Sequence, residues 1–427
     1  MSADLPWPPR IAVIGLGYVG LPLAVALARH FAVTGFDIAE DRVAELREGR
    51  DRTAEVDDAT LKASALTCTA DADALADHDL YIITVPTPVT ETNEPDLSAL
   101  LSACATLGPR LKPGAVVVSE STVYPGVTEE ICGPALEKAS GLKVGDKLLL
   151  GYSPERINPG DREHTVDRIT KIVAGQTPAV TDWLARVYGA MNGDNIHRAP
   201  NIMTAEAAKA IENAQRDINI AFVNEVAMIA QALDLSVFDI LDAANTKWNF
   251  LKFQPGLVGG HCIGVDPYYL AARAKQVGHD PRVILSGRSI NDAVGDWLAG
   301  RLADLLGKPS RILVLGLTFK ENVPDLRNTK VVDLVDGLVR RYHEVDVHDA
   351  MADPAEAKAH YGIDLLTGPL SDLSGYDAVV GTVPHQAYAA LDGAGLAALL
   401  TPDGLVADVK GMWRAVALPD GLRRWQF

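Results

Sequence analysis

The start of the chain alternates between apolar and polar stretches in the order strand, turn, helix and strand. An apolar run over 11–14 precedes the turn, a helical rhythm of apolar positions covers 21–30, and a second apolar run over 31–36 ends at Asp37. The turn contains Gly15, Gly17 and Gly20. Glycines at this spacing permit a tight turn and close backbone approach, and the N-terminus of the following helix attracts a pyrophosphate. The pattern predicts a dinucleotide site, and the Asp37 carboxylate favours NAD over its 2′-phosphorylated relative.

Further apolar runs of strand type follow and are separated by helical segments. They cover residues 80–85, 115–120, 147–151 and 169–174. Strands that alternate with helices indicate a doubly wound parallel sheet, whose ligand side lies at the carboxyl ends of the strands. Polar clusters occur at three of these ends, over 86–88, 121–126 and 153–156. Each cluster alone is typical of a polar loop or cap, but three at successive strand ends indicate a cleft.

The longest helical pattern begins near Thr204, its expected N-cap, and continues to about Leu233. One apolar stripe runs along it, formed by Ile211, Ile218, Phe222, Ile229 and Leu233. Such a length exceeds the span of one domain, so we expect a bridging helix that also offers a subunit interface. Lys209 and Asn213 are four residues apart and share a face of this helix. Without a reactive site nearby, a solvated lysine is the simpler interpretation of Lys209.

A second pattern of strands and helices starts at residue 310. Strand-type runs cover 311–316, 344–348, 378–382 and 405–408, and a helix is expected over 331–341. No complete glycine motif follows the first of these strands, so this smaller α/β domain is expected to bind a nucleotide in a different way. No sequence repeat relates the two ends of the chain, although they can share an architecture.

Composition narrows the functional classes. The chain has 427 residues, enough for two or three domains, and a net charge of −17. This charge argues against nucleic acid as a partner, because nonspecific binding to nucleic acid needs clustered Lys and Arg. No apolar run approaches the roughly 20 residues of a membrane-spanning helix, and the first ten residues lack the apolar core of a signal peptide. The cysteines show neither metal nor disulfide spacing, which fits a reducing cytoplasm; they are Cys68, Cys104, Cys132 and Cys262.

The segment 256–267 carries the most reactive combination of residue types. Cys262 lies among four glycines, at positions 256, 259, 260 and 264, and Asp266 follows four residues later. Glycines let the backbone approach a ligand closely, and a thiol in such a loop is accessible and tunable. The alternative is a glycine-rich turn around a small buried cysteine. The adjacent His261 favours a thiolate if it faces Cys262, but a packed ring is an equal interpretation.

A nicotinamide site beside a reactive thiol supports a four-electron oxidation. Hydride loss turns an alcohol into an aldehyde, the thiolate adds to the aldehyde, and a second hydride loss gives a thioester that water cleaves to a carboxylate. Each turnover therefore consumes two NAD. The residue types for this chemistry are present: a nucleophile in Cys262, oxyanion donors in Lys209 and Asn213, and bases in Asp266 and Glu155.

These motifs resemble those of the UDP-glucose/GDP-mannose dehydrogenases over nearly the whole chain. The resemblance rests on the segments 15–20, 121–123, 153–155, 205–213, 256–267, 316–320 and 325–327. It implies two Rossmann-like domains joined by a long helix that builds a homodimer, with a nucleotide-sugar held between the domains. We therefore expect an NAD-binding domain over 1–200, a central helical domain with the cysteine loop over 201–305 and a UDP-sugar-binding domain over 306–427.

The resemblance also implies roles for individual residues. The catalytic set is the nucleophile Cys262, the oxyanion pair Lys209 and Asn213, the base Asp266, and Glu155 with Thr122, which hold a water beside the nicotinamide. Cofactor contacts are expected from Gly15, Gly17, Tyr18, Val19, Gly20, Asp37, Arg42, Thr87, Thr122 and Arg327. Substrate contacts are expected from Glu155, Arg156, Lys209, Asn213, Phe253, Gly259 and Lys320, and no metal is expected.

Three segments distinguish branches of this family. Members that oxidise UDP-glucose usually read Pro-Glu-Phe-Leu-Arg where this chain reads Pro-Glu-Arg-Ile-Asn at 154–158. They also carry an arginine, supplied by the neighbouring subunit, in the segment that here reads Asn-Thr-Lys-Trp-Asn-Phe at 245–250. Segments 156–160, 215–219 and 246–250 instead resemble the branch that acts on UDP-N-acetylglucosamine or UDP-N-acetylgalactosamine, whose uronates feed capsule and O-antigen synthesis. The two C4 epimers leave no readable difference in the sequence.

Three other functions remain open at this point. The nearest is the same chemistry on UDP-glucose or GDP-mannose. A two-electron hydroxyacid dehydrogenase shares the dinucleotide domain and the long helix, but it needs no thiol and releases one NADH per substrate. A catalytically silent nucleotide-sugar sensor is the alternative from another class, and the presence of Cys262, Lys209 and Asp266 argues against it.

Overall fold

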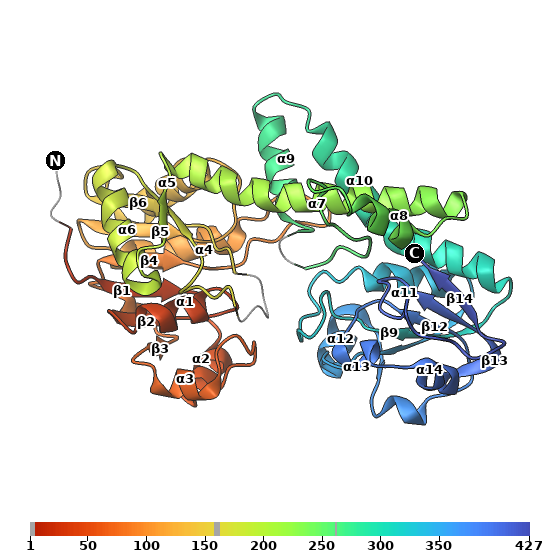
Figure 1. The fold of residues 1–427 in the computed structure, drawn as a ribbon. Coiled ribbons are helices and arrows are strands. Elements are labelled where there is room, and N and C mark those ends of the chain that lie inside the picture. The colour runs from red at the N-terminus through yellow and green to blue at the C-terminus, as the bar shows by residue number, and fades with distance from the viewer. Residues whose placement is uncertain (1–4, 158–162, 261–262) are drawn as a thin grey trace. The chain divides into compact units, whose positions relative to one another are not determined.

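The computed structural model describes residues 5–157, 163–260 and 263–427 and divides the chain into two compact units. The first unit comprises Met1–Glu212 with Tyr268–Asp280, and the second comprises Asn213–Pro267 with Pro281–Phe427. The long helix α7, Ile202–Ala232, passes from one unit into the other (Figure 1). The expected α/β fold, with two Rossmann-like domains joined by a long helix, is confirmed.

An eight-stranded sheet forms the centre of the first unit, in the order β3-β2-β1-β4-β5-β6-β7-β8. Its strands are β1 (Arg10–Ile14), β2 (Ala32–Phe36), β3 (Thr67–Thr69), β4 (Leu80–Ile83), β5 (Ala115–Ser119), β6 (Leu148–Tyr152), β7 (Lys171–Gly175) and β8 (Ile196–Arg198). The central strands β4 and β5 are buried along their whole length. Their unbroken apolar sequences therefore follow from cover on both faces of the sheet.

The helices of the first unit connect these strands. They are α1 (Gly20–Leu27), α2 (Glu40–Arg47), α3 (Asp58–Ala63), α4 (Ser98–Leu107), α5 (Gly133–Ser140) and α6 (Pro178–Asn192), with the shorter η1 (Ala72–Leu75), η2 (Gly108–Arg110) and η3 (Thr128–Cys132). Asp57 and Thr177 cap α3 and α6 by accepting backbone N–H groups. Apolar side chains of α1 and α6 share one core with the sheet.

Strand β7 departs from the predicted parallel sheet. It runs antiparallel to β6, with Gly151 opposite Gly175. A parallel neighbour needs a crossover connection, which is usually a helix. The described parts of the connection, 153–157 and 163–170, contain no helix, so the chain returns beside β6 in the opposite direction. The prediction of a parallel strand was therefore wrong at this one position.

The second unit contains a six-stranded parallel sheet in the order β11-β10-β9-β12-β13-β14. Its strands are β9 (Arg311–Leu315), β10 (Glu344–His348), β11 (Leu365–Leu366), β12 (Tyr376–Gly381), β13 (Leu400–Asp408) and β14 (Arg423–Gln426). Its helices are α8 (Val237–Ala244), α10 (Arg282–Leu306), α11 (Val331–Arg340), α12 (Pro354–Tyr361), η4 (Leu370–Asp372), α13 (Gln386–Ala389) and α14 (Gly393–Leu399), and α9 (Asp266–Gln276) begins at its border. The strand order repeats that of β3 to β6 in the first sheet, so the shared architecture of the two ends is confirmed.

Helix α7 begins two residues before its expected start. Asn201 caps it, because its Oδ1 accepts the backbone N–H of Thr204 at 2.8 Å. The prediction of Thr204 as the N-cap was therefore wrong. The buried positions along this helix include a series of alanines, among them Ala214, Ala221, Ala227 and Ala230.

The apolar stripe of α7 lies at the surface. Ile211, Phe222, Ile229 and Leu233 are each more than half exposed, and Ile218 is half-buried. Isolated exposed apolar residues are ordinary, but a row of large ones along a single helix is typical of an interaction surface.

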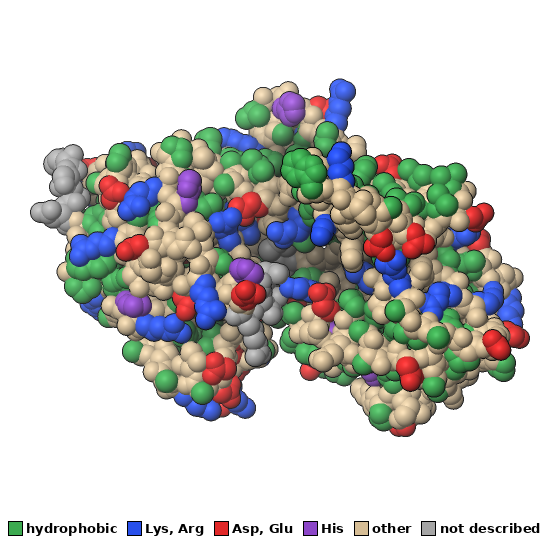
Figure 2. All heavy atoms as spheres, in the orientation of Figure 1, with side chains coloured by type: hydrophobic (Ala, Val, Ile, Leu, Met, Phe, Trp, Pro, Cys, Tyr) green, Lys and Arg blue, Asp and Glu red, His purple; other side chains and the backbone are tan. Residues whose placement is uncertain are grey.

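Charged side chains of both signs are mixed over the face shown in Figure 2. The net charge of −17 therefore does not gather into a single acidic region on that face. Among the helices that the structure describes, none has the length and apolar character of a membrane span.

Candidate active site

The three glycines after β1 serve different purposes. Gly15 has φ +92°, a conformation that favours glycine. A Cβ on Gly20 would lie 1.8 Å from the Gly15 carbonyl oxygen and 2.4 Å from Thr84 Oγ1. Gly17 is exposed, and a Cβ there would meet nothing within 4 Å. The chain itself therefore requires two of the glycines, while Gly17 leaves open space beside the N-terminus of α1, where a pyrophosphate fits.

Asp37 stands at the carboxyl end of β2, fixed but still accessible. One carboxylate oxygen accepts the backbone N–H of Leu16 at 2.8 Å, and the other accepts that of Ala39 at 3.0 Å. The residue is half-buried, so part of the carboxylate can accept bonds from ribose hydroxyls. These features fit NAD.

Arg42 lies behind the glycine turn and is buried. Its Nε donates to the Leu16 carbonyl at 3.0 Å, and its Nη2 contacts Asp51 at 2.7 Å. Burial acts to raise the pKa of Asp51, but hydrogen bonds from Arg42 and from the Val56 backbone outweigh it and lower that pKa. Arg42 therefore builds the turn from within the protein, and its contact with the ribose stays a prediction.

Hydroxyl groups tie the ends of the central strands together. Thr84, directly after β4, donates to the carbonyls of Ile14 and Gly15 at 2.9 and 2.8 Å. Thr87 donates to the Thr122 carbonyl at 2.6 Å, so two of the predicted cofactor contacts lie side by side. Thr84 was not predicted, because a threonine at the end of a strand has no distinctive local signal.

The loop that carries Thr122 is anchored to α7. Glu206 is fully buried, and its carboxylate accepts the backbone N–H groups of Gly126 and Thr128 at 2.6 and 2.9 Å. Burial raises the pKa of Glu206 to about 7, despite these hydrogen bonds. Glu206 thus connects α7, which carries Lys209, to the loop that carries the predicted water-binding Thr122.

Glu155 belongs to a buried charged cluster that was not predicted from the sequence. Its Oε2 lies 3.4 Å from Lys171 Nζ, and that ammonium contacts Glu120 Oε2 at 2.5 Å. Tyr188 donates to the other oxygen of Glu120 at 2.6 Å. Burial acts to lower the pKa of Lys171, but attraction from the two carboxylates outweighs it and raises that pKa. No local motif signals this cluster, because its members come from separate elements.

Arg156 extends from the same loop towards α7. Its guanidinium forms two bonds to Glu212, at 3.2 and 2.8 Å, and a third to the Thr170 carbonyl at 3.0 Å. This paired geometry is the strong form of an arginine–carboxylate contact. Its predicted contact with substrate stays a prediction.

Two of the predicted catalytic residues meet in the second unit. Asn213 Nδ2 donates to Asp266 Oδ2 at 2.5 Å across 53 residues of sequence, and both side chains are buried. Lys209, four residues before Asn213 in α7, is only 6% exposed, which contradicts the alternative of a solvated lysine. The Asn213 amide therefore holds the Asp266 carboxylate, a hydrogen-bond acceptor, in place. Lys209, on the same helix as Asn213, supplies a buried ammonium.

Cys262 and His261 lie outside the described residues, but the preceding segment is held firmly. The Asn224 side chain bonds both the N–H and the carbonyl of Gly256, at 2.8 and 3.0 Å. A Cβ on Gly259 would lie 2.7 Å from the Asn328 carbonyl, and one on Gly260 would lie 2.8 Å from the Phe319 ring. Gly259 and Gly260 therefore let other parts of the protein, the Asn328 carbonyl and the Phe319 ring, approach the backbone closely.

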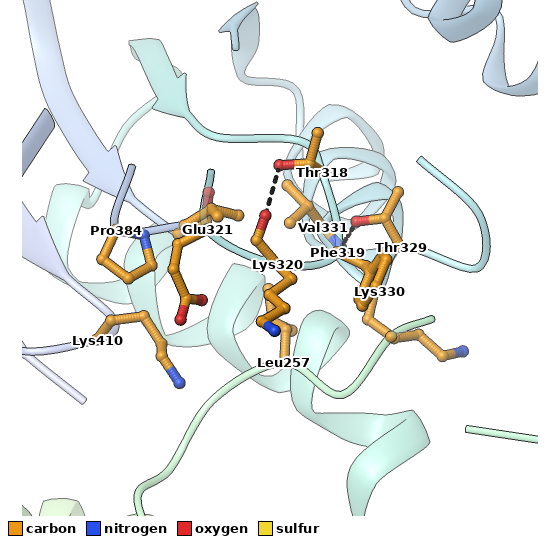
Figure 3. A pocket seen from close by; sticks show the side chains of 13 residues that line it. Leu257, Thr318, Phe319, Lys320, Glu321, Thr329, Lys330, Val331, Pro384 and Lys410 are labelled. Carbon is orange, nitrogen blue, oxygen red and sulfur yellow. Dashed lines mark hydrogen bonds between the residues drawn. The ribbon is translucent and has the colours of Figure 1, made fainter. Parts of the chain in front are cut away.

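A basic pocket lies beside this segment in the second unit (Figure 3). Leu257, Gly259, Lys320 and Lys330 line it, and Lys410 lies beside the carboxylate of Glu321 at its edge. Lys410 Nζ donates to the Pro255 carbonyl at 3.1 Å, and burial lowers its pKa. Cations gathered in this way suit a diphosphate. Lys320 was predicted, whereas Lys410 was missed because nothing in its local sequence marks it.

Tyr18 and Val19 lie in the glycine turn directly before α1, and their cofactor contacts stay predictions. Two further predicted contacts, Arg327 and Phe253, lie elsewhere in the second unit. Arg327 pairs with Asp325 through two nitrogens, at 2.9 and 2.6 Å, and is 40% exposed. Phe253 is half-buried and packs against the core of this unit. The roles of Arg327 at the cofactor and of Phe253 at the substrate stay predictions.

Comparisons with known proteins are consistent over the whole chain. Models of the UDP-glucose/GDP-mannose dehydrogenase family match it with their NAD binding domain at residues 9–192, their central domain at 203–293 and their UDP binding domain at 313–415. Protein CapL of Staphylococcus aureus is 48% identical over 98% of this chain and 99% of its own. UDP-N-acetyl-D-glucosamine 6-dehydrogenase of Pseudomonas aeruginosa is 48% identical over 89% of this chain and 91% of its own. The solved UDP-D-ManNAc dehydrogenase of Pyrococcus horikoshii superposes with a TM-score of 0.87 at 28% identity, covering 97% of this chain and 98% of that one.

Proposed function

This chain belongs to the UDP-glucose/GDP-mannose dehydrogenase family and is an NAD-dependent dehydrogenase, and we propose that it oxidises the C6 hydroxyl of a UDP-N-acetylhexosamine to a carboxylate. The contact between Asn213 and Asp266 carries the reaction type, because it pairs two expected catalytic groups beside the cysteine segment. The N-acetylated substrate is supported by the name of the Pseudomonas relative and by the segments 156–160, 215–219 and 246–250. We propose UDP-N-acetylglucosamine and UDP-N-acetylgalactosamine equally as substrates, because the sequence shows no difference that separates the two epimers.

In this proposal each catalytic residue has one role. When bound, NAD accepts hydride from C6. Asp266 accepts the hydroxyl proton, while Lys209 and Asn213 donate hydrogen bonds to the developing oxyanion. Cys262 adds to the aldehyde, so that the second oxidation gives a thioester. Glu155 and Thr122 hold the water that cleaves this thioester and releases the uronate.

The basic pocket is the proposed site for the UDP moiety. Lys320 and Lys410 supply positive charge to a pocket that the Leu257 segment also lines. Ammonium groups act as point charges towards phosphate oxygens. We propose that this pocket supplies the local positive charge that an anionic substrate needs on a chain of net charge −17.

The exposed stripe of α7 is the proposed homodimer interface. Phe222 and Ile229 are 57% and 54% exposed, and a second copy of the chain would remove both from water. Phe222→Glu should shift the protein from dimer to monomer in light scattering after gel filtration. Val339→Glu is the matched control, because Val339 is 53% exposed on α11, away from the stripe. A monomeric wild-type protein would overturn this interface.

The decisive experiment follows NADH to completion with NAD and four substrates: UDP-N-acetylglucosamine, UDP-N-acetylgalactosamine, UDP-glucose and GDP-mannose. Two NADH per N-acetylated sugar are expected. Turnover confined to UDP-glucose or GDP-mannose would overturn the substrate assignment and keep the mechanism. One NADH per substrate would favour a two-electron dehydrogenase, and no turnover would favour a sensor.

Two variants test the residue roles. Cys262→Ser should stall with a bound intermediate while the fold is kept, and unchanged steady-state oxidation would contradict the thiol mechanism. Lys209→Ala should lower kcat about 10²–10³-fold, the typical cost of one lost oxyanion donor. A nearly unaffected kcat would remove Lys209 from the catalytic set.

The proposal extends to the setting of the reaction. The three described cysteines, Cys68, Cys104 and Cys132, are free and buried, which agrees with the expectation of a reducing cytoplasm. We propose a cytoplasmic enzyme whose uronate product supplies surface polysaccharide synthesis. Deletion of its gene in the producing cell should remove the N-acetylhexosaminuronate from that polysaccharide.

A further inference from the structure

Lys171 is a fully buried lysine in a strand that otherwise carries small and apolar residues. Strand β7 reads Lys-Ile-Val-Ala-Gly and is buried at every position. Lys171 Nζ lies 2.5 Å from Glu120 Oε2, 3.3 Å from the Pro154 carbonyl and 3.4 Å from Glu155 Oε2. Its three neighbours are therefore two carboxylates and a carbonyl, and one of those carboxylates belongs to the predicted catalytic set.

Stability does not explain why charges are buried here. Removing ions from water is costly, and replacement of a buried ion pair by apolar residues of similar size is often neutral or stabilising. Glu120 is also fully paired, because Tyr188 donates to its Oε1 at 2.6 Å while Lys171 binds its Oε2. A strand needs no such arrangement to pack, so the cluster is better explained by what it does to Glu155.

Glu155 faces few other charged groups. Its Oε1 accepts the backbone N–H of Arg156 at 2.6 Å, and the Arg156 side chain is directed to Glu212 of α7. Among the described residues, Lys171 of β7 is the cation within 4 Å of Glu155. The same ammonium also contacts Glu120, which directly follows β5. Tyr188 of α6 reaches Glu120 and not Glu155.

We propose that Lys171 is a positioning residue that supplies the opposite charge for Glu155 and fixes its orientation, and that Glu120 holds Lys171 in place for this task. The inference rests on the proposed role of Glu155 in holding the hydrolytic water. Two carboxylates share one ammonium, so removal of the ammonium leaves like charges close together in a buried site, where one of them takes up a proton. A protonated Glu155 no longer accepts a hydrogen bond from that water with both of its oxygens. Burial already raises the pKa of Glu120, which agrees with a cluster that depends on its single cation.

The test compares Lys171→Gln with Glu120→Gln across a range of pH, using NADH production from NAD and the N-acetylated UDP-sugar. In Lys171→Gln the acid limb of the kcat profile should move up by about 1–2 pH units, the usual effect of one close opposite charge. At pH values on this limb kcat should therefore fall about 10- to 100-fold, with KM for the sugar nearly unchanged. In Glu120→Gln the limb should stay in place or move down, because the ammonium then faces Glu155 alone.

Folding controls accompany both variants. Thermal unfolding and an NAD titration of each protein separate a damaged fold from a changed pH profile. If Lys171→Gln does not fold, the double variant Glu120→Gln/Lys171→Gln carries the test, because it removes one charge of each sign. Its acid limb should lie above that of Glu120→Gln.

The outcomes are separable. Equal loss of activity at every pH in folded Lys171→Gln, with no movement of the limb, would show a merely structural lysine and overturn the inference. An upward shift in Glu120→Gln as large as that in Lys171→Gln would also overturn it. A wild-type protein without turnover on any nucleotide-sugar would instead remove the proposed function itself, and with it the task assigned to Lys171.

Discussion

The first strand of each Rossmann-like sheet ends in a turn that is held by the same set of hydrogen bonds, and we call this hydrogen-bonded turn the frame. In the first unit, the N–H of Gly15 donates to the Phe36 carbonyl at 2.8 Å and the N–H of Leu16 donates to Asp37 at 2.8 Å. Thr84, after β4, donates its hydroxyl to two carbonyls of the turn. The acidic residue at the end of the second strand and the threonine at the end of the fourth thus clamp the turn between them.

The second unit repeats every one of these bonds. The N–H of Gly316 donates to the His348 carbonyl at 2.9 Å, and the N–H of Leu317 donates to Asp349 at 2.5 Å. The hydroxyl of Thr382 donates to the carbonyls of Leu315 and Gly316 at 2.9 and 2.7 Å. The two sheets therefore share local chemistry as well as strand order.

The difference lies in what occupies the space beside the acidic residue. Asp37 is half-buried, and Gly17 next to it leaves open space. Asp349 is buried, and His385 Nε2 lies 3.2 Å from its Oδ2. His385 also contacts Thr318 at 2.9 Å and therefore covers the carboxylate whose equivalent in the first unit, Asp37, is only half-buried. One frame is open to a dinucleotide, and the other is closed and stabilises the segment that leads to Lys320 in the basic pocket.

The largest effect is expected from Gly20→Ala. The new methyl would lie 1.8 Å from a backbone carbonyl that cannot move without breaking the turn. We expect the first unit to lose more than about 3 kcal/mol of stability, at or beyond the upper end for overpacked sites, and to lose NAD binding. Hydrogen exchange should report the loss in β1 and β4 and not in β9.

Gly17→Ala is its matched control. A Cβ at Gly17 meets no atom within 4 Å, so the fold should be kept. NAD affinity should still fall, because the methyl enters the space that we assign to the pyrophosphate. Equal destabilisation by the two substitutions would show that the open side of the turn was misidentified.

The next effect is expected from Asp349→Asn in the closed frame. Asparagine keeps one acceptor oxygen, so buried backbone donors are left unpaired, and each costs about 1–3 kcal/mol. We expect a loss of about 3 kcal/mol that hydrogen exchange places in β9 and β10. Asp37→Asn at the equivalent position should cost less, because Asp37 is half-buried whereas Asp349 is buried. Similar losses at both positions would contradict the contrast between an open and a closed frame.

Asp349 should also make the second unit sensitive to acid. Burial acts to raise its pKa, but hydrogen bonding and charge from His385, with the backbone N–H groups of Leu317 and Thr318, outweigh it and lower that pKa far below 3.8. A depressed folded-state pKa means that the stabilisation is complete above the unfolded value and is lost as the pH falls below about 4. Protection of β9 against hydrogen exchange should decline in that range in the wild type and change less in Asp349→Asn.

A smaller effect is expected on cofactor choice in the open frame. Asp37→Asn removes the charge that repels a 2′-phosphate and weakens the bonds to the ribose hydroxyls. A hydrogen bond to a charged group contributes about 1.5–3 kcal/mol, so the ratio of kcat/KM for NAD over NADP should fall at least about tenfold. An unchanged ratio would remove Asp37 from the ribose site.

The smallest effect tests what the frames share. Thr84→Val and Thr382→Val each remove one hydroxyl that donates to two carbonyls at nearly the same distances. Both should cost about 1 kcal/mol, the usual net contribution of a hydrogen bond, each within its own unit. Clearly different losses of stability in the two variants would show that the frames differ in more than the group beside their acidic residue.

Part of the site was predictable because its signals are local. The glycine turn, Asp37, Lys209 with Asn213, and the segment around Cys262 are each defined within a few residues of sequence. Their backbone conformations and helical spacing follow from neighbouring residues alone. The polar runs after β4, β5 and β6 were also predictable as a group, because parallel strands end at one edge of the sheet.

Other parts had no local signal. Lys171 meets Glu120 across 51 residues and Glu155 across 16, and His385 meets Asp349 across 36. The antiparallel direction of β7 was missed for a related reason, because the strand sequence carries no information about the direction of its partner. Such contacts depend on which elements the sheet order places together.

The sequence by itself determined the fold class and the presence of an NAD-binding domain, and it predicted the residue types of the catalytic set. Short-range spacing specifies a turn, a cap or a helix face, because only near neighbours restrict the backbone there. The tertiary structure alone decided which of two equivalent frames is open, which lysines are buried and which groups Lys171 and Lys410 contact. Burial and pairing arise when distant segments pack, and the electrostatics of this site follow from that packing.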